Sequence, residues 1–126
     1  MAEPVEVVGD EDFRSAALAR PGVWAVAFIA DWCPHSRAFV PRFAALADRY
    51  PQLLFGDLSN DDSPLWDRLA IGVVPTVIVF VDGQPHDRFD GIPGVGLPAE
   101  ALDRVAEALD RRGAPPARRP RRSTGS

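Results

Sequence analysis

The feature that most constrains the fold of this chain is an uninterrupted apolar run from Val23 to Ala30, which reads Val-Trp-Ala-Val-Ala-Phe-Ile-Ala. A strand without polar positions is covered on both faces, as in the middle of a parallel sheet flanked by helices. A helical pattern follows, because Phe39, Phe43 and Tyr50 recur at helical spacing within residues 34–50. A covered central strand followed by an amphipathic helix indicates an α/β fold.

The segment before this strand and the helix after it carry their own start signals. Val5–Val8 is typical of a short strand, and a helix is expected over Glu11–Arg20 with Asp10 as its N-cap. The helix at 34–50 begins with a proline, which suits a first turn, and Pro41 is expected to kink it. We expect it to be the longest helix of the chain.

The second half of the chain alternates strand and helix signals up to a hairpin. The expected elements are, in order, a strand at Leu53–Leu58, a short helix that starts at Ser63-Pro64, a strand at Thr76–Val81, a turn at Asp82-Gly83, a strand at Pro85–Asp90 and a helix from Pro98 to Arg112. This order predicts a three-layer α/β sandwich, with a mixed central sheet of about five strands and helices on both faces. The core is expected to include Trp24, Phe28, Trp66 and Phe80.

Length and composition place these elements in one domain. The chain has 126 residues, of which 46% are hydrophobic and 25% charged, as is usual for a globular domain with one core. We expect this domain to span residues 1–112. Residues 113–126 are rich in Pro and Arg and are expected to form a disordered tail. No apolar run approaches the roughly 20 residues that cross a bilayer, and the start shows no export leader, so we expect a cytoplasmic protein without a membrane partner.

Charge is unevenly distributed along the chain. All 18 acidic residues and eight of the 14 basic ones precede position 111, so this part carries 8 − 18 = −10 and the remainder +6. An acidic body disfavours nucleic acid, whose binding needs a basic footprint. Every basic residue is arginine, and together with abundant Ala, Pro and Asp this composition indicates a GC-rich bacterial source.

The chain has one cysteine, Cys33, so an internal disulfide and a four-cysteine zinc site are both excluded. Cys33 lies between the central strand and a helix N-terminus, where backbone N–H groups and the helix dipole favour a thiolate. Protonated His35 would add to this effect, and the Ser36 hydroxyl is expected to donate a hydrogen bond to the sulfur. No recognised ligand spacing joins Cys33 and His35 to His86, so we expect neither a metal nor a cofactor.

The segment Ala30-Asp31-Trp32-Cys33-Pro34-His35-Ser36, with Pro41 in the following helix, resembles the thioredoxin active-site segment, Trp-Cys-x-x-Cys with a later proline. Val74-Pro75-Thr76, before an apolar strand, resembles the cis-proline element of the same family. The resemblance covers residues 5 to 112 and implies a thioredoxin-like fold with Cys33 as nucleophile, tuned by His35 and Ser36. For substrate binding it implies Trp32, Pro34, Val74, Pro75 in cis, Thr76 and Gly91.

Three positions depart from the family pattern. Ser36 stands where the resolving cysteine belongs, Ala27 where thioredoxins bury an acid, and Gly56 near the place of its lysine partner. The dipeptide Pro34-His35 is that of DsbA-like oxidases. Ser36 is either natural or an engineered replacement that traps substrates, and the sequence does not separate the two.

A single thiolate can attack a disulfide but cannot release itself from the mixed disulfide by a second internal attack. We therefore expect a monomeric monothiol oxidoreductase or isomerase that reacts with protein disulfides or thiols and is released by glutathione or another small thiol. The alternative is a non-enzymatic adaptor, whose groove near Trp32 and Pro75 holds a partner without covalent exchange. Monothiol glutaredoxins, which assemble an iron–sulfur cluster, carry a Gly-Phe pair that this chain lacks.

Overall fold

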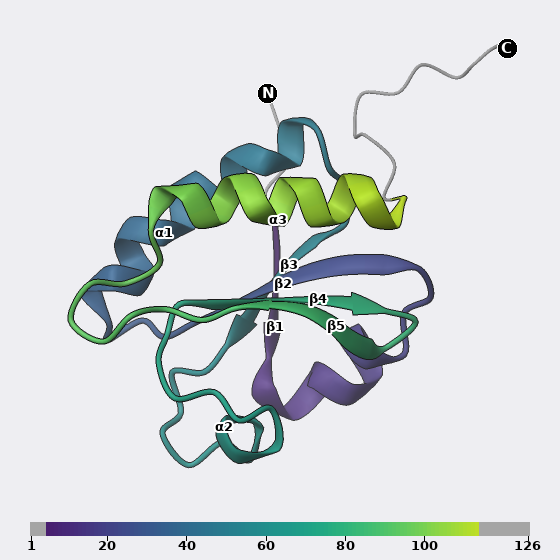
Figure 1. Ribbon diagram of the computed structural model, residues 1–126. Helices are drawn as coiled ribbons and strands as arrows, with labels where there is room; N and C mark the ends of the chain where they lie inside the picture. The colour runs from purple at the N-terminus through teal and green to yellow at the C-terminus, as the bar shows by residue number, and fades with distance from the viewer. Residues whose placement is uncertain (1–4, 114–126) are drawn as a thin grey trace, which may run out of the picture.

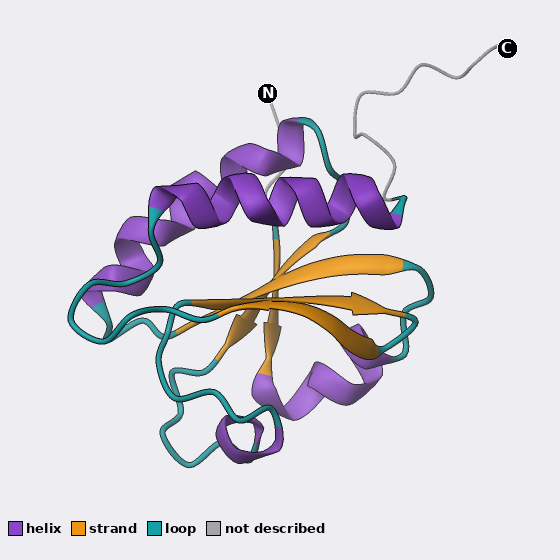
Figure 2. Ribbon diagram, viewed as in Figure 1, coloured by secondary structure: helices purple, strands orange, loops and turns teal. Residues whose placement is uncertain are grey.

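The computed structural model describes residues 5–113, which form a mixed sheet between two layers of helices (Figure 1, Figure 2). The strands are β1 (Glu6–Gly9), β2 (Val23–Ile29), β3 (Leu53–Asp57), β4 (Thr76–Val81) and β5 (Gln84–Phe89). The helices are η1 (Asp10–Asp12), η2 (Arg14–Leu18), α1 (Pro34–Ala44), η3 (Ala45–Asp48), α2 (Leu65–Arg68) and α3 (Ala99–Arg112). The expected three-layer α/β sandwich is confirmed.

The sheet has the strand order β1-β3-β2-β4-β5, so the apolar run lies in its middle strand. β2 is parallel to β3, with Ala27 beside Phe55, and antiparallel to β4, with Ala27 beside Val77. The prediction of a covered central strand is therefore confirmed, although its pairing is parallel on one side only. β1 is parallel to β3, and β5 is antiparallel to β4.

Two hydrophobic cores lie on opposite faces of this sheet. Helices α1 and α3 cover one face, and η1, η2 and α2 cover the other (Figure 2). The first core includes Phe43 and Leu109, both fully buried. The second includes Phe13 and Phe28, whose ring centroids lie 5.3 Å apart. Because the chain buries apolar side chains on both faces, the middle strands have no solvent-facing side, which explains the uninterrupted apolar run.

The expected helix over Glu11–Arg20 is wrong in form. The segment is a 3-10 turn at Asp10–Asp12 followed by a π-helical turn at Arg14–Leu18, and Asp10 lies inside the first turn instead of capping it. Phe13 joins the two turns and is fully buried against the sheet. Packing of this ring, and not a polar cap, therefore sets the path of the backbone.

The helix expected at 34–50 is shorter than predicted. α1 ends at Ala44 with Pro41 inside it, and the chain continues as the 3-10 turn η3, in which the Ala45 N–H bonds to the Pro41 carbonyl. The longest helix is α3 with 14 residues, so that expectation is corrected. Among residues 5–113, no helix combines the length and the apolar character needed to cross a membrane.

The hairpin at Asp82-Gly83 is confirmed. Asp82 and Gly83 have φ values of 50° and 82°, as the favoured tight hairpin turns require. α3 ends at Arg112, and its C-cap Gly113 adopts the left-handed conformation with φ 86°. The tail expected to be disordered is residues 113–126, and all of it but Gly113 lies outside the described part of the chain.

Candidate functional site

Cys33 lies at the junction that the sequence predicts, between the end of β2 and the first turn of α1. It is the N-cap of α1, and Pro34 occupies the first turn. The Cys33 N–H donates to the Ala30 carbonyl at 3.1 Å, and the Arg37 N–H donates to the Cys33 carbonyl at 3.1 Å. These bonds fix a tight turn that presents the cysteine side chain to the loop before β4.

The sulfur meets the segment that resembles the cis-proline element. The Val74–Pro75 peptide bond is cis, as expected. The Cys33 Sγ–H donates to the Val74 carbonyl at 3.6 Å, although the two residues lie 41 positions apart. Cys33 is only 8% exposed, so this residue is largely covered by its neighbours. The fold thus brings together the two features that the sequence had placed in separate segments.

The hydrogen bond that the structure shows for Ser36 is to the backbone, whereas none to the sulfur is found among the described residues. Ser36 is 1% exposed, and its Oγ accepts a hydrogen bond from the Ala30 N–H at 3.2 Å. Ala30 directly follows β2. Its N–H bonds to Ser36 and its carbonyl to the Cys33 N–H, so both residues stabilise the same turn. Ser36 therefore contributes to the site by holding the backbone before Cys33.

Gly91 lies against the cis-proline segment. A Cβ atom at this position would come within 2.5 Å of the Pro75 carbonyl oxygen, so only glycine allows this approach. Thr76, which is fully buried, joins the same parts, because its Oγ1 donates to the Val73 carbonyl at 2.6 Å and accepts from the Gly91 N–H at 3.5 Å. Pro75, Thr76 and Gly91 thus belong to one packed unit.

His35 faces the far end of the Gly91 loop. It is partly exposed, and its Cβ and ring lie so close to Gly96 that a Cβ there would meet them at 3.0 to 3.2 Å. Ile92 and Val95, in the same loop, are 47% and 61% exposed. Trp32, which directly precedes Cys33, is 51% exposed.

A polar network outside the predicted set supports Trp32. Its indole N–H donates to the Ser59 carbonyl at 2.9 Å, and the Ser59 hydroxyl accepts from the Asp31 N–H at 2.8 Å. The Asp57 carboxylate in turn accepts hydrogen bonds from the Ser59 N–H and hydroxyl. The sequence alone gives little indication that Ser59 supports Trp32, because a serine after a strand is common in loops.

Trp66 also contacts Trp32, which the sequence did not predict. It was expected in the core, but it is only partly buried and stacks on Trp32, with ring centroids 6.4 Å apart and planes 20° apart. Its indole N–H donates to the Asn60 carbonyl at 3.1 Å. Trp24 is likewise partly buried, whereas Phe28 and Phe80 are in the core as predicted.

Beneath the site, the positions that depart from the family pattern carry no titratable group. Ala27 is fully buried in β2. Gly56 lies under the ring of Phe28, and a Cβ there would come within 2.7 Å of it, so this phenyl ring excludes a longer side chain. Among residues 5–113, no cluster of three or more His, Cys, Asp or Glu side chains is arranged to hold a metal.

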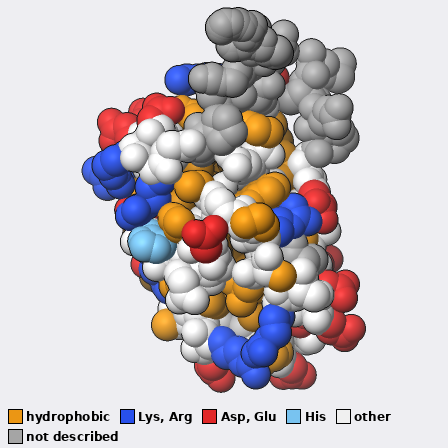
Figure 3. Space-filling view, turned by 90° about the vertical axis from the view of Figure 1, so that its right-hand side faces the viewer, with side chains coloured by type: hydrophobic (Ala, Val, Ile, Leu, Met, Phe, Trp, Pro, Cys, Tyr) orange, Lys and Arg blue, Asp and Glu red, His pale blue; other side chains and the backbone are white. Residues whose placement is uncertain are grey.

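Figure 3 shows a face of the molecule on which arginine and acidic side chains are interspersed with hydrophobic ones. Arg111 and Arg112 of α3 both pair with Asp87 of β5. The hydrogen bond from Arg112 is the main reason that the pKa of Asp87 is lowered. Burial, followed by its hydrogen bond to Asp110, raises the pKa of Tyr50.

Comparison with known proteins agrees with this arrangement. The thioredoxin family model matches residues 4–103. Thioredoxin from Chlamydia caviae is 30% identical over 89 residues, which are 70% of this chain and 85% of that protein. Protein disulfide-isomerase A3 from Gallus gallus is 30% identical over 94 residues, but the chain spans only 18% of that protein.

Solved structures show the same fold. Thioredoxin f from spinach chloroplast superimposes with a TM-score of 0.68 at 22% identity, covering 86% of this chain and 85% of that one. These relatives support a function of the thiol–disulfide oxidoreductase type. A family match over most of the chain, the sheet order and the Cys33 junction lead to one conclusion: the chain belongs to the thioredoxin family.

Proposed function

We propose that the protein carries out monothiol exchange, in which Cys33 forms mixed disulfides with protein or small-molecule partners. The observation that carries this proposal is the contact between the Cys33 sulfur and the Val74 carbonyl beside a cis-proline. The only other sulfur of the chain is the thioether of Met1, which cannot resolve an adduct. His35, Pro34 and the buried Thr76 shape this site, and Ser36 holds its turn.

The exchange takes two steps. The Cys33 thiol loses its proton to solvent, and the thiolate attacks a partner disulfide, so that one S–S bond forms, another breaks and the second partner sulfur leaves as a thiolate. An external thiol, such as glutathione, then attacks the mixed disulfide and releases Cys33. Since Ser36 offers no thiol, the lifetime of the mixed disulfide depends on that external thiol.

The rim of the site supports a peptide partner. Trp32, Ile92 and Val95 are exposed; Trp32 directly precedes Cys33, and Ile92 and Val95 follow Gly91, which packs on Pro75. Exposed apolar side chains near a reactive sulfur favour an extended segment that pairs with the backbone at Val74, as an added strand does. We infer that residues 1–112 form the exchange unit, which agrees with the end of α3 at Arg112.

The experiment compares the wild-type protein with Cys33→Ala toward a peptide disulfide and toward the same peptide with serine in place of cysteine. Exchange predicts a covalent adduct on Cys33 by mass spectrometry, no binding of the serine peptide above a weak background, and release of the adduct by glutathione. A folded wild-type protein that forms no adduct contradicts the proposal.

The low exposure of Cys33 favours a second candidate, an adaptor that holds its partner without covalent exchange. In that case Cys33→Ala binds the cysteine-free peptide as tightly as the wild-type protein does. Equal affinities without an adduct would therefore establish the adaptor and exclude exchange.

A further inference from the structure

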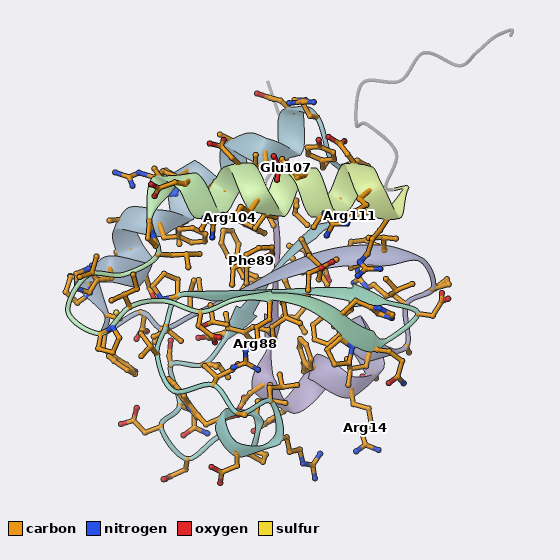
Figure 4. All side chains as sticks on the ribbon, viewed as in Figure 1. Arg14, Arg88, Phe89, Arg104, Glu107 and Arg111 are labelled. Carbon is orange, nitrogen blue, oxygen red and sulfur yellow. The ribbon has the colours of Figure 1, made fainter. Side chains whose placement is uncertain are left out.

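Arg88 of β5 makes four hydrogen bonds that connect three segments near the site. Its Nη1 donates to the Leu69 carbonyl at 2.5 Å, and its Nη2 donates to the Ala70 carbonyl at 2.6 Å. Its Nε donates to both carboxylate oxygens of Asp90, at 2.9 and 3.2 Å. In Figure 4 the Arg88 side chain lies on the sheet face that carries α2, whereas Phe89 points toward α3.

The two carbonyls that Arg88 binds directly follow α2, since Leu69 is its C-cap and Ala70 the next residue. The last carbonyls of a helix have no partner within it, and a cation is favourable there. Ala70 also has a φ of 51°, a left-handed conformation that is costly for a residue with a Cβ. A planar guanidinium can bind two neighbouring carbonyls and a carboxylate at once, so Arg88 holds this bend in a way that lysine cannot.

The bend leads directly into the site. From Ala70 the chain passes through Ile71, which is 5% exposed, to Val74, whose carbonyl accepts the Cys33 thiol. On the other side, Asp90 precedes Gly91, which packs on the Pro75 carbonyl. Arg88 therefore connects Leu69 and Ala70, where the segment leading to the cis-proline begins, with Asp90, which precedes the Gly91 loop.

Thr76, next to Pro75, makes a second connection between the same two parts of the chain. Its hydroxyl lies between the Val73 carbonyl and the Gly91 N–H. The segment from Leu69 to Thr76 is thus hydrogen-bonded to β5 and the loop after it at two points. Arg88 makes the contact at the start of the segment, and Thr76 makes the contact at its end. Without Arg88, the hydroxyl of Thr76 makes the remaining side-chain hydrogen bond that the described structure shows between this segment and the Gly91 loop.

We propose that Arg88 is a positioning residue, which holds the Val74 backbone in the place where a peptide partner aligns with Cys33. This inference rests on the proposed exchange function and adds a determinant of peptide recognition to it. It predicts a selective loss: reaction with a peptide disulfide depends on Arg88, whereas reaction with a small disulfide, which needs only the sulfur, does not.

The test uses two probes with the same leaving group. One is 5,5′-dithiobis(2-nitrobenzoate), and the other is a single-cysteine peptide joined by a disulfide to the same nitrobenzoate thiolate. In both cases Cys33 forms a mixed disulfide and the coloured thiolate leaves. The measured quantity is the ratio of the rate constants, peptide probe over small probe. The variants are Arg88→Met, which keeps an apolar stem without donors, and Arg88→Lys.

The control is Arg104→Met, which removes the same charge from an exposed position on α3 (Figure 4). We expect the ratio to fall about fivefold in Arg88→Met, consistent with the loss of charge-assisted hydrogen bonds, to recover in part in Arg88→Lys, and to stay unchanged in the control. Amide hydrogen exchange over residues 69–74 should accelerate in Arg88→Met only.

An unchanged ratio in folded Arg88→Met, or an equal fall in Arg104→Met, overturns the role of Arg88. If Arg88→Met does not fold, Arg88→Lys decides: a wild-type ratio overturns the proposal and a reduced ratio supports it. A wild-type protein that reacts with neither probe contradicts the exchange function instead, and the amide exchange of residues 69–74 then tests whether Arg88 holds the segment.

Discussion

Ser36 is the residue that most limits the proposed exchange, because it stands where the thioredoxin pattern has a second cysteine. The Ser36 hydroxyl oxygen accepts a hydrogen bond from the Ala30 N–H. Ser36 lies one helical turn from Cys33 on the same side of α1. In the proposed exchange, a thiol at this position would therefore lie one helical turn from the Cys33 mixed disulfide. The sequence identified the position, but the bond to Ala30 depends on how β2 ends and could not be predicted from it.

Replacing Ser36 by cysteine should restore internal release. The introduced thiol attacks the Cys33 mixed disulfide, forms an internal disulfide and frees the partner thiol, so the lifetime of the adduct should shorten by about 100-fold or more. The lifetime is followed by mass spectrometry after removal of free thiols. Ser36→Ala is the control and should keep the wild-type lifetime; a long-lived adduct in Ser36→Cys would contradict the proposed geometry.

Gly91 tests the close contact with Pro75. Gly91→Ala places a Cβ within 2.5 Å of the Pro75 carbonyl oxygen and should lower the free energy of unfolding by about 1–3 kcal/mol. Gly72→Ala is a matched control, because no atom lies within 4 Å of the added Cβ, and its effect should stay within about 0.5 kcal/mol. Urea unfolding measures both; equal stabilities would show that the loop can move away at no cost.

At the scale of elements, turn chemistry and tertiary packing share the control of the structure. The β4–β5 hairpin follows its Asp-Gly turn, which is a local signal. The η1–η2 segment instead follows Phe13, whose ring packs on Phe28 and Phe80 from strands far along the chain. The predicted start at Asp10 correctly indicated a helical segment, but its 3-10 and π turns depend on contacts with distant strands that no local signal contains.

The link between β5 and α3 should depend on pH. Arg112 and Arg111 stabilise the Asp87 carboxylate, so its pKa is lower in the folded chain than in the unfolded chain. The resulting stability is present above the unfolded pKa, near 4, and is lost as the pH falls through the folded pKa.

Asp87→Asn should therefore destabilise the protein by about 0.5–1 kcal/mol at neutral pH, a difference that disappears toward pH 2. Thermal unfolding from pH 7 to pH 2 measures it. Asp103→Asn, at an exposed position on α3, is the control and should show little effect at any pH. A difference between wild type and Asp87→Asn that persists at low pH would exclude the carboxylate as its cause.

At the scale of the whole molecule, one sheet separates two cores, and both rest on the same strands. Val77 and Val79 of β4 belong to one core, and Ile78 and Phe80 to the other. Because successive side chains of a strand point to opposite faces, neither core can open without disturbing the sheet. We therefore expect the described domain to unfold as one cooperative unit.

Phe43→Leu tests this coupling. Phe43 lies in the core under α1 and α3, whereas Trp24 and Trp66 pack against the other core. The substitution should lower stability by about 1 kcal/mol and shift the tryptophan fluorescence transition as much as the far-UV circular dichroism transition. Phe13→Leu, in the opposite core, should behave alike. A fluorescence transition that stays in place in Phe43→Leu would show that the two cores unfold separately.

The sequence by itself determined the order of strands and helices, the hairpin, the place of Cys33 before α1 and the proline at position 75, because periodicity, turn chemistry and short motifs are local. The tertiary structure decided which partners these residues meet. Three contacts arise where separate segments pack together: the hydrogen bond of Ser36 to Ala30, the stacking of Trp66 on Trp32, and the hydrogen bonds of Arg88 to Leu69 and Ala70. Such contacts depend on distances between chain segments, and those distances exist only once the apolar faces have packed on the sheet.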